Sequence, residues 1–99
     1  MLYLVEVEAS IEKANEIDRS GGPAETIGKI IERFSPQGIW GDSTRRRILM
    51  VVELETPAKT TELMYVLTWF AGGNPRFTPI MPLDVFGEAI EKAKGIVSP

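Results

Sequence analysis

The sequence contains no cysteine and no histidine. Without cysteine the chain can form no disulfide, no thiolate-bound zinc or iron–sulfur site and no thiol nucleophile. Without histidine it lacks the most common general base, the most common transition-metal ligand and the usual proximal haem ligand. We therefore expect no cofactor and no metal site. Any metal that did bind would have to be a hard cation, such as magnesium or calcium, held by carboxylates.

The chain also has no excess of positive charge and no long apolar run. Eleven Lys and Arg residues stand against 14 Asp and Glu residues, a formal net charge of −3, which argues against a nucleic acid as partner. No run approaches the roughly 20 apolar residues that span a bilayer. Because carboxylates interrupt residues 2–8, we expect neither a signal peptide nor a membrane partner. Small secreted domains often depend on disulfides, so the absence of cysteine favours a cytoplasmic location.

What the 99 residues do contain is an alternation of strand and helix patterns, enough for one domain over residues 1–99. Strands are expected at residues 2–8, 39–41, 46–55 and 76–81, and helices at 11–19, 24–34, 57–70 and 83–94. This order predicts an α+β fold, a ferredoxin-like βαββαβ sandwich with an antiparallel sheet plus a C-terminal helix. Whether residues 10–34 form one broken helix or two stays open, because Gly21, Gly22 and Pro23 interrupt the pattern.

Several residues are expected to begin or end these elements. Ser10 fits a helix N-cap, and Thr56 fits another, with Pro57 at the first helical position. Gly95 fits the C-cap of the last helix. Pro79 cannot donate to a sheet ladder, so the last strand is expected to be short or to lie at an edge.

The third strand is apolar on both faces. Ile48, Met50 and Val52 point one way, whereas Leu49 and Val51 point the other. A sheet that is wet on one side should alternate apolar and polar residues, so both faces need a cover, and two helices supply only one. We favour a homodimer through the open sheet face; the alternatives are coverage by the C-terminal helix or an ordinary apolar strand centre.

Four short segments carry a resemblance to a known superfamily: Gly38–Gly41, Leu49–Glu53, Leu67–Trp69 and Phe77–Ile80. The chain resembles the dimeric α+β-barrel superfamily, in which two ferredoxin-like subunits pack sheet to sheet. Within it, the chain looks most like a small uncharacterised prokaryotic family of unknown function, over about residues 36 to 90. The resemblance implies a homodimer and a cavity between sheet and helices, and no particular chemistry.

Three aromatic residues are candidates for binding a small flat ligand in such a cavity: Trp40, Tyr65 and Trp69. Tyr65 lies one helical turn before Trp69, so their rings can stack. A pocket lined by the three would suit a flat apolar molecule. The alternative is that both tryptophans are core or dimer contacts.

If the protein is an enzyme, the proton-handling group is expected to be either Tyr65 or Glu53, and Glu53 is the candidate that lies on a strand. It shares a face of the third strand with Val51, where a dry site would raise its pKa and make it a general base. Glu6 could approach it to share a proton or a hard metal. Some proteins of the resembled superfamily are cofactor-independent monooxygenases or isomerases, which is the enzymatic alternative. The other alternative is a solvated strand end.

The run of arginines at 45–47 follows the expected hairpin turn. Such a run can clamp a phosphate or carboxylate, so Arg47 is a candidate ligand-binding residue of an anion-binding regulatory module. The alternative is an exposed turn, or ion pairing with Asp42, Glu6 or Glu8.

Overall fold

The computed structural model describes residues 1–97. The elements in chain order are β1 (Leu2–Glu8), α1 (Ile11–Arg19), α2 (Ala24–Phe34), β2 (Gly38–Gly41), β3 (Arg47–Glu53), α3 (Pro57–Ala71), β4 (Arg76–Pro79) and α4 (Leu83–Val97). The chain is therefore α+β, with an antiparallel four-stranded open sheet and four helices in the described part, which is compatible with a ferredoxin-like fold. The expected order of strands and helices is confirmed.

The sheet has the strand order β2-β3-β1-β4. The two longest and most apolar strands, β1 and β3, lie at its centre and pair in antiparallel fashion, with Leu4 opposite Val51 and Val5 opposite Met50. Strand β4, which contains Pro79, lies at an edge and is only four residues long, as its proline predicted. The alternation of faces expected for β3 agrees with this register.

Residues 10–34 form two helices, which settles the question that the sequence left open. The chain turns between them at Gly21 and Gly22, whose φ angles of +102° and +96° lie in the left-handed region that favours glycine. Pro23 precedes the first residue of α2 and serves as its N-cap residue. The glycine pair therefore allows α1 and α2 to take separate directions.

The predicted helix N-caps are confirmed. Ser10 Oγ accepts a hydrogen bond from the Lys13 backbone N–H at 3.1 Å, and Thr56 Oγ1 accepts one from the Lys59 backbone N–H at 3.2 Å. The prediction for Gly95 is wrong, because α4 continues through it to Val97. A glycine costs a helix about 1 kcal/mol relative to alanine and does not by itself end one.

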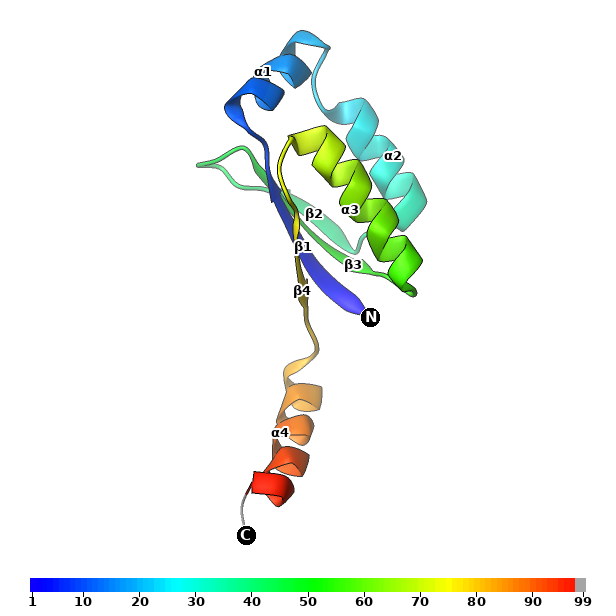
Figure 1. Ribbon diagram of the computed structural model, residues 1–99, viewed down its shortest axis with the longest axis vertical. Helices are drawn as coiled ribbons and strands as arrows, with labels where there is room; N and C mark the ends of the chain where they lie inside the picture. Colours follow the sequence, from blue (N-terminus) through cyan, green and yellow to red (C-terminus); the bar gives the residue numbers. More distant parts are fainter. Residues whose placement is uncertain (98–99) are drawn as a thin grey trace.

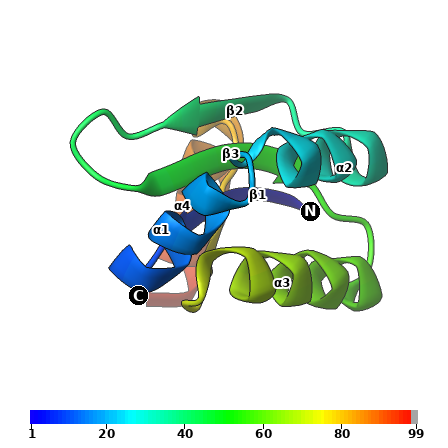
Figure 2. The same cartoon turned by 90° about the horizontal axis from the view of Figure 1, so that it is seen from above.

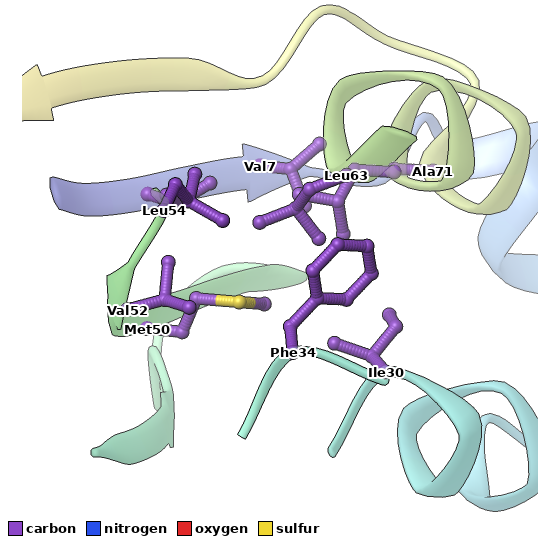
Figure 3. Close-up of a cluster of buried hydrophobic side chains, with 10 residues drawn as sticks. Val7, Ile30, Phe34, Met50, Val52, Leu54, Leu63 and Ala71 are labelled. Carbon is purple, nitrogen blue, oxygen red and sulfur yellow. The ribbon is translucent and has the colours of Figure 1, made fainter. Parts of the chain in front are cut away.

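The core lies between one face of the sheet and the helices α2 and α3, which lie on the same side of it (Figure 1 and Figure 2). The strands β1 and β3 contribute buried side chains to it, and the helices and the residue after β3 contribute the rest (Figure 3). The buried cluster comprises Val5, Val7, Ile30, Phe34, Met50, Val52, Leu54, Leu63, Leu67 and Ala71. Burying such side chains is the main source of stability for a domain of this size.

Helix α4 lies outside this domain. It follows β4 and extends beyond the end of the sheet, which gives the molecule principal extents of 61 × 27 × 19 Å (Figure 1). None of its residues up to Val97 is buried, and none of the packed pairs of elements within residues 1–97 includes it. The last helix therefore does not cover the second face of the sheet, which was one of the alternatives for that face.

The core predicts a large cost for truncating Leu67, which is fully buried at the centre of α3. We expect Leu67→Ala to lower the free energy of unfolding by about 2–5 kcal/mol, because transfer free energy and packing are both lost. Met64→Ala on the same helix, where the side chain is 39% exposed, is the matched control and should cost much less. Urea denaturation followed by circular dichroism measures both; equal costs would contradict this core.

Candidate functional site

The face of the sheet opposite α2 and α3 is apolar in its middle. We call the five residues here the open-face patch: Leu2, Leu4, Trp40, Leu49 and Val51. They come from three neighbouring strands, and the register places them side by side. Trp40 is exposed and the other four are half-buried. No helix in the described part of the chain packs on this patch, so it is an apolar surface in contact with water.

The indole of Trp40 lies over its neighbour Gly38. A Cβ atom at Gly38 would stand 2.5 Å from Cη2 of the indole, so only glycine permits this close approach. The ring is nevertheless 55% exposed, because nothing in residues 1–97 covers its outer side. Trp40 thus enlarges the apolar surface of the open face.

One end of the open face is charged. Arg47 donates a hydrogen bond from Nη1 to Glu6 Oε1 at 3.0 Å and pairs through Nη2 with Asp42 Oδ2 at 3.1 Å. Asp42 also accepts hydrogen bonds from the Thr44 N–H at 2.9 Å and the Thr44 hydroxyl at 2.7 Å. These two hydrogen bonds, followed by the Arg47 charge, lower the pKa of Asp42 below its usual value of 3.8.

The three consecutive arginines do not converge on one point. Arg45 pairs with Glu8 at 3.7 Å, and Arg46 donates a hydrogen bond to Asn15 at 3.3 Å. Arg47 already has two carboxylate partners, so its charge is neutralised without a ligand. The contacts of Arg45 and Arg47 are ion pairs with Glu8, Glu6 and Asp42, the partners given above as the alternative, whereas Arg46 contacts a neutral residue. The role of Arg47 in binding an anion stays a prediction.

Glu53 lies at the other end of the open face and is exposed, with its carboxylate 2.6 Å from the Met1 ammonium group. The register pairs Glu53 with Leu2 and Glu6 with Leu49, so the two carboxylates are four residues apart along β1. At about 3.3 Å per residue they are separated by about 13 Å. They therefore do not share a proton or a metal ion within one chain.

A groove of about 790 Å³ opens between α2 and α3, on the opposite side of the sheet from the open-face patch. We call it the α2–α3 groove. Its lining includes the core residues Ile30 and Phe34 of α2, together with Tyr65 and Val66 of α3. The volume lies within the range of small-molecule sites, and the lining is predominantly apolar, as in most such sites.

An ion pair joins the two helices that form the α2–α3 groove. Arg33 of α2 donates from Nε and Nη2 to Oε1 of Glu62 on α3, at 3.1 and 2.8 Å. Both residues line the groove, as do Lys29, Thr26 and Thr61. The pair contributes little stability because it is exposed, but it places donors and acceptors beside an apolar surface. A ligand in this groove would meet both kinds of group.

The three candidate aromatic residues lie in two separate places. Tyr65 and Trp69 are neighbours on the exposed side of α3, as their spacing predicted, but their rings are tilted by 49° with centroids 6.5 Å apart and do not stack. The Lys13 ammonium lies 5.8 Å from the Trp69 ring centroid. Trp40, however, lies on the open face. The structure therefore does not bring the three residues into one pocket of a single chain.

Sequence reasoning missed most of the α2–α3 groove. Only Tyr65 among the proposed ligand-binding residues lines it. A signal for its floor was present, because Ile30 and Phe34 fall on the apolar face of their helix at spacing i, i+4. No pattern in the sequence indicates that Arg33 and Glu62, 29 positions apart, would meet across it.

Within residues 1–97, no three acidic side chains gather into a cluster that could hold a metal ion. In the same part of the chain no helix combines the length and the apolar character needed to cross a membrane. Comparison with models of protein families finds no match, and comparison with curated proteins finds none either. The features of the described residues that bear on function are the open face, the α2–α3 groove and α4.

Because the pKa of Asp42 is lowered, the contribution of this residue to stability should depend on pH. A carboxyl group whose pKa is lower in the native state than in the unfolded chain stabilises the fold at pH values above the unfolded pKa. This contribution is lost as the pH falls through the native pKa. We therefore expect Asp42→Asn to be less stable than the wild type near neutral pH, with the difference shrinking as the pH falls from 3.8 through the lower native pKa. Urea denaturation across this pH range measures it, with Asp18→Asn on exposed α1 as the control. A difference that persists unchanged at the lowest pH would contradict the assignment.

Proposed function

We propose that this protein is a homodimeric small-molecule-binding module of the dimeric α+β-barrel kind. Two copies associate through their open sheet faces, and each offers its α2–α3 groove to a small, flat, largely apolar ligand. The antiparallel sheet, its strand order and the helices on one face support a ferredoxin-like assignment. The resemblance of residues 36 to 90 to that superfamily supports the same assignment.

The observation that carries dimerisation is the open-face patch. Its residues lie on three neighbouring strands, and no helix in residues 1–97 covers them. Full burial of an apolar side chain of this size contributes about 1.5–3 kcal/mol. A contiguous exposed apolar patch rimmed by charged residues is typical of an interaction surface. A second copy supplies an identical patch, and isologous contacts are the most common kind in homodimers.

The observation that supports ligand binding is the chemistry of the α2–α3 groove. Its floor consists of core side chains, Phe34 among them, and Tyr65 supplies an aromatic wall. The Arg33–Glu62 pair and the nearby threonine hydroxyls can orient a polar group at the edge of such a ligand. The groove lies away from the open face, so dimerisation and ligand binding do not compete for the same surface.

Dimerisation through the open-face patch predicts a strong effect for Leu49→Lys. The new ammonium would be removed from water at the interface, where its cross-strand neighbour Glu6 already pairs with Arg47. We therefore expect the dimer to dissociate at concentrations where the wild type is dimeric. Ile11→Lys, at an exposed apolar residue of α1, is the matched control and should remain dimeric. Sedimentation equilibrium measures the mass. A wild type that remains an 11.0 kDa monomer at high concentration would contradict the proposal.

Ligand binding in the α2–α3 groove can be tested with anilinonaphthalene sulfonate, a flat apolar anion whose fluorescence rises in apolar surroundings. We expect Ala58→Trp, which fills the groove, to weaken its binding at least about tenfold, or about 1.4 kcal/mol. Met64→Trp on the same helix lies outside the groove lining and should leave the affinity unchanged. Equal affinities for both variants would place the dye elsewhere and contradict a ligand site in this groove.

A further inference from the structure

Helix α4 is amphipathic, yet its apolar side packs on nothing in residues 1–97. The apolar side chains recur at helical spacing and form one stripe: Leu83, Phe86, Ile90, Ala93 and Val97. The opposite side carries acidic residues at i, i+4 and i+7, namely Asp84, Glu88 and Glu91. A single helix of 15 residues is marginal in water, so α4 needs a surface for its stripe.

The linker before α4 holds it away from its own domain. Only Ile80, Met81 and Pro82 separate β4 from α4, and three residues span at most about 10 Å. Pro82 restricts the preceding Met81 to extended conformations, which continues the direction of β4 rather than reversing it. In the structure α4 accordingly extends beyond the sheet (Figure 1). The α2–α3 groove of the same chain, on the far side of the sheet, is out of its reach.

We propose that α4 of each copy packs across the open face of the second copy, in a reciprocal exchange of C-terminal helices. This inference rests on the proposed homodimer through the open face, and it places α4 of the partner on that face where direct packing would place the partner's sheet. A helix of 15 residues is about 22 Å long, and the seven-residue strands β1 and β3 are about 23 Å long, so the helix can cover the open-face patch along its length. One exchange covers both apolar surfaces that a single chain leaves exposed.

The charges of α4 are placed so that they do not oppose this packing. Asp84, Glu88 and Glu91 lie on the side of α4 opposite the stripe, so they stay in water when the stripe packs on an open face. On that face Arg45 and Arg47 keep the carboxylate partners that they have within one chain. Packing two sheets directly on each other would instead leave α4 and its apolar stripe in water.

The chain contains no cysteine, so pairs of introduced cysteines report contacts without interference. We would mix a tagged full-length chain carrying Ile90→Cys, on the stripe of α4, with an untagged full-length chain carrying Leu49→Cys, on the open face. After mild oxidation we expect a disulfide-linked heterodimer on a non-reducing gel. Ile11→Cys, on exposed α1, replaces Leu49→Cys in the control and should give at least about tenfold less of the linked product.

Other results of the same experiment would overturn the exchange. A dimer in which Leu49→Cys links only to Leu49→Cys of its partner would indicate direct sheet-to-sheet packing, so the exchange would fail while the proposed dimer stood. A link within one chain of the double variant would mean that α4 folds onto its own open face. A wild-type chain that sediments as a monomer would remove both the dimer and the exchange.

A second measurement does not depend on disulfide geometry. Ile90→Glu places a charge in the apolar stripe, and we expect it to raise the dimer dissociation constant at least tenfold in sedimentation experiments. Lys92→Glu makes a charge change on the polar side of the same helix and should have a much smaller effect. If Ile90→Glu leaves the dissociation constant unchanged, α4 does not contribute to the interface and the proposal is wrong.

Discussion

The structure depends on the pairing of β1 with β3, because this pair presents apolar side chains to both sides of the sheet. On one side, Val5 and Met50 are buried beneath α2 and α3 and form the centre of the core. On the other side, Leu4 and Val51 lie opposite each other and remain in contact with water. A domain with a single layer of helices can bury only the first set. The need to cover the second set is therefore the constraint on the rest of the structure.

The edges of the sheet indicate how that constraint can be met. Strand β4 has only four residues and ends at Pro79, and the other edge strand, β2, is equally short and bounded by Gly38 and Gly41. Short edge strands and prolines are poor templates for pairing with the edge of another sheet. Association through the edges is therefore disfavoured. Association through the face, where the apolar residues are, remains open.

Much of the fold could be predicted from periodicity and capping. The alternation in β3 predicted which of its residues share a face, and Ser10 and Thr56 predicted where two helices begin. These features could be predicted because they depend on residues close together in sequence. Gly95 was misjudged because a glycine on an exposed helix ends it only when the following backbone turns away, which composition does not show.

The candidate site could be predicted less well, because it depends on how distant segments are placed. The position of Trp40 on the open face follows from Ile39 pairing with Met50, which the sequence alone does not specify. Tyr65 lies on the helix layer, so the two aromatic residues are on opposite sides of the sheet. The α2–α3 groove likewise requires knowing that Arg33 and Glu62 face each other. Periodicity shows that a surface is apolar, but it does not show what covers that surface.

The same distinction applies to α4, because the sequence predicted that a helix forms there but not what that helix packs against. A monomer would keep two apolar surfaces in water, the open-face patch and the stripe that includes Phe86 and Ile90. The linker carries α4 away from the sheet and so leaves the stripe exposed. In the proposed dimer the same linker makes the stripe accessible to a second copy. Covering both surfaces requires no new element, only a second chain related by a twofold axis. The stability of this small domain would then depend on protein concentration, since only the dimer buries both surfaces.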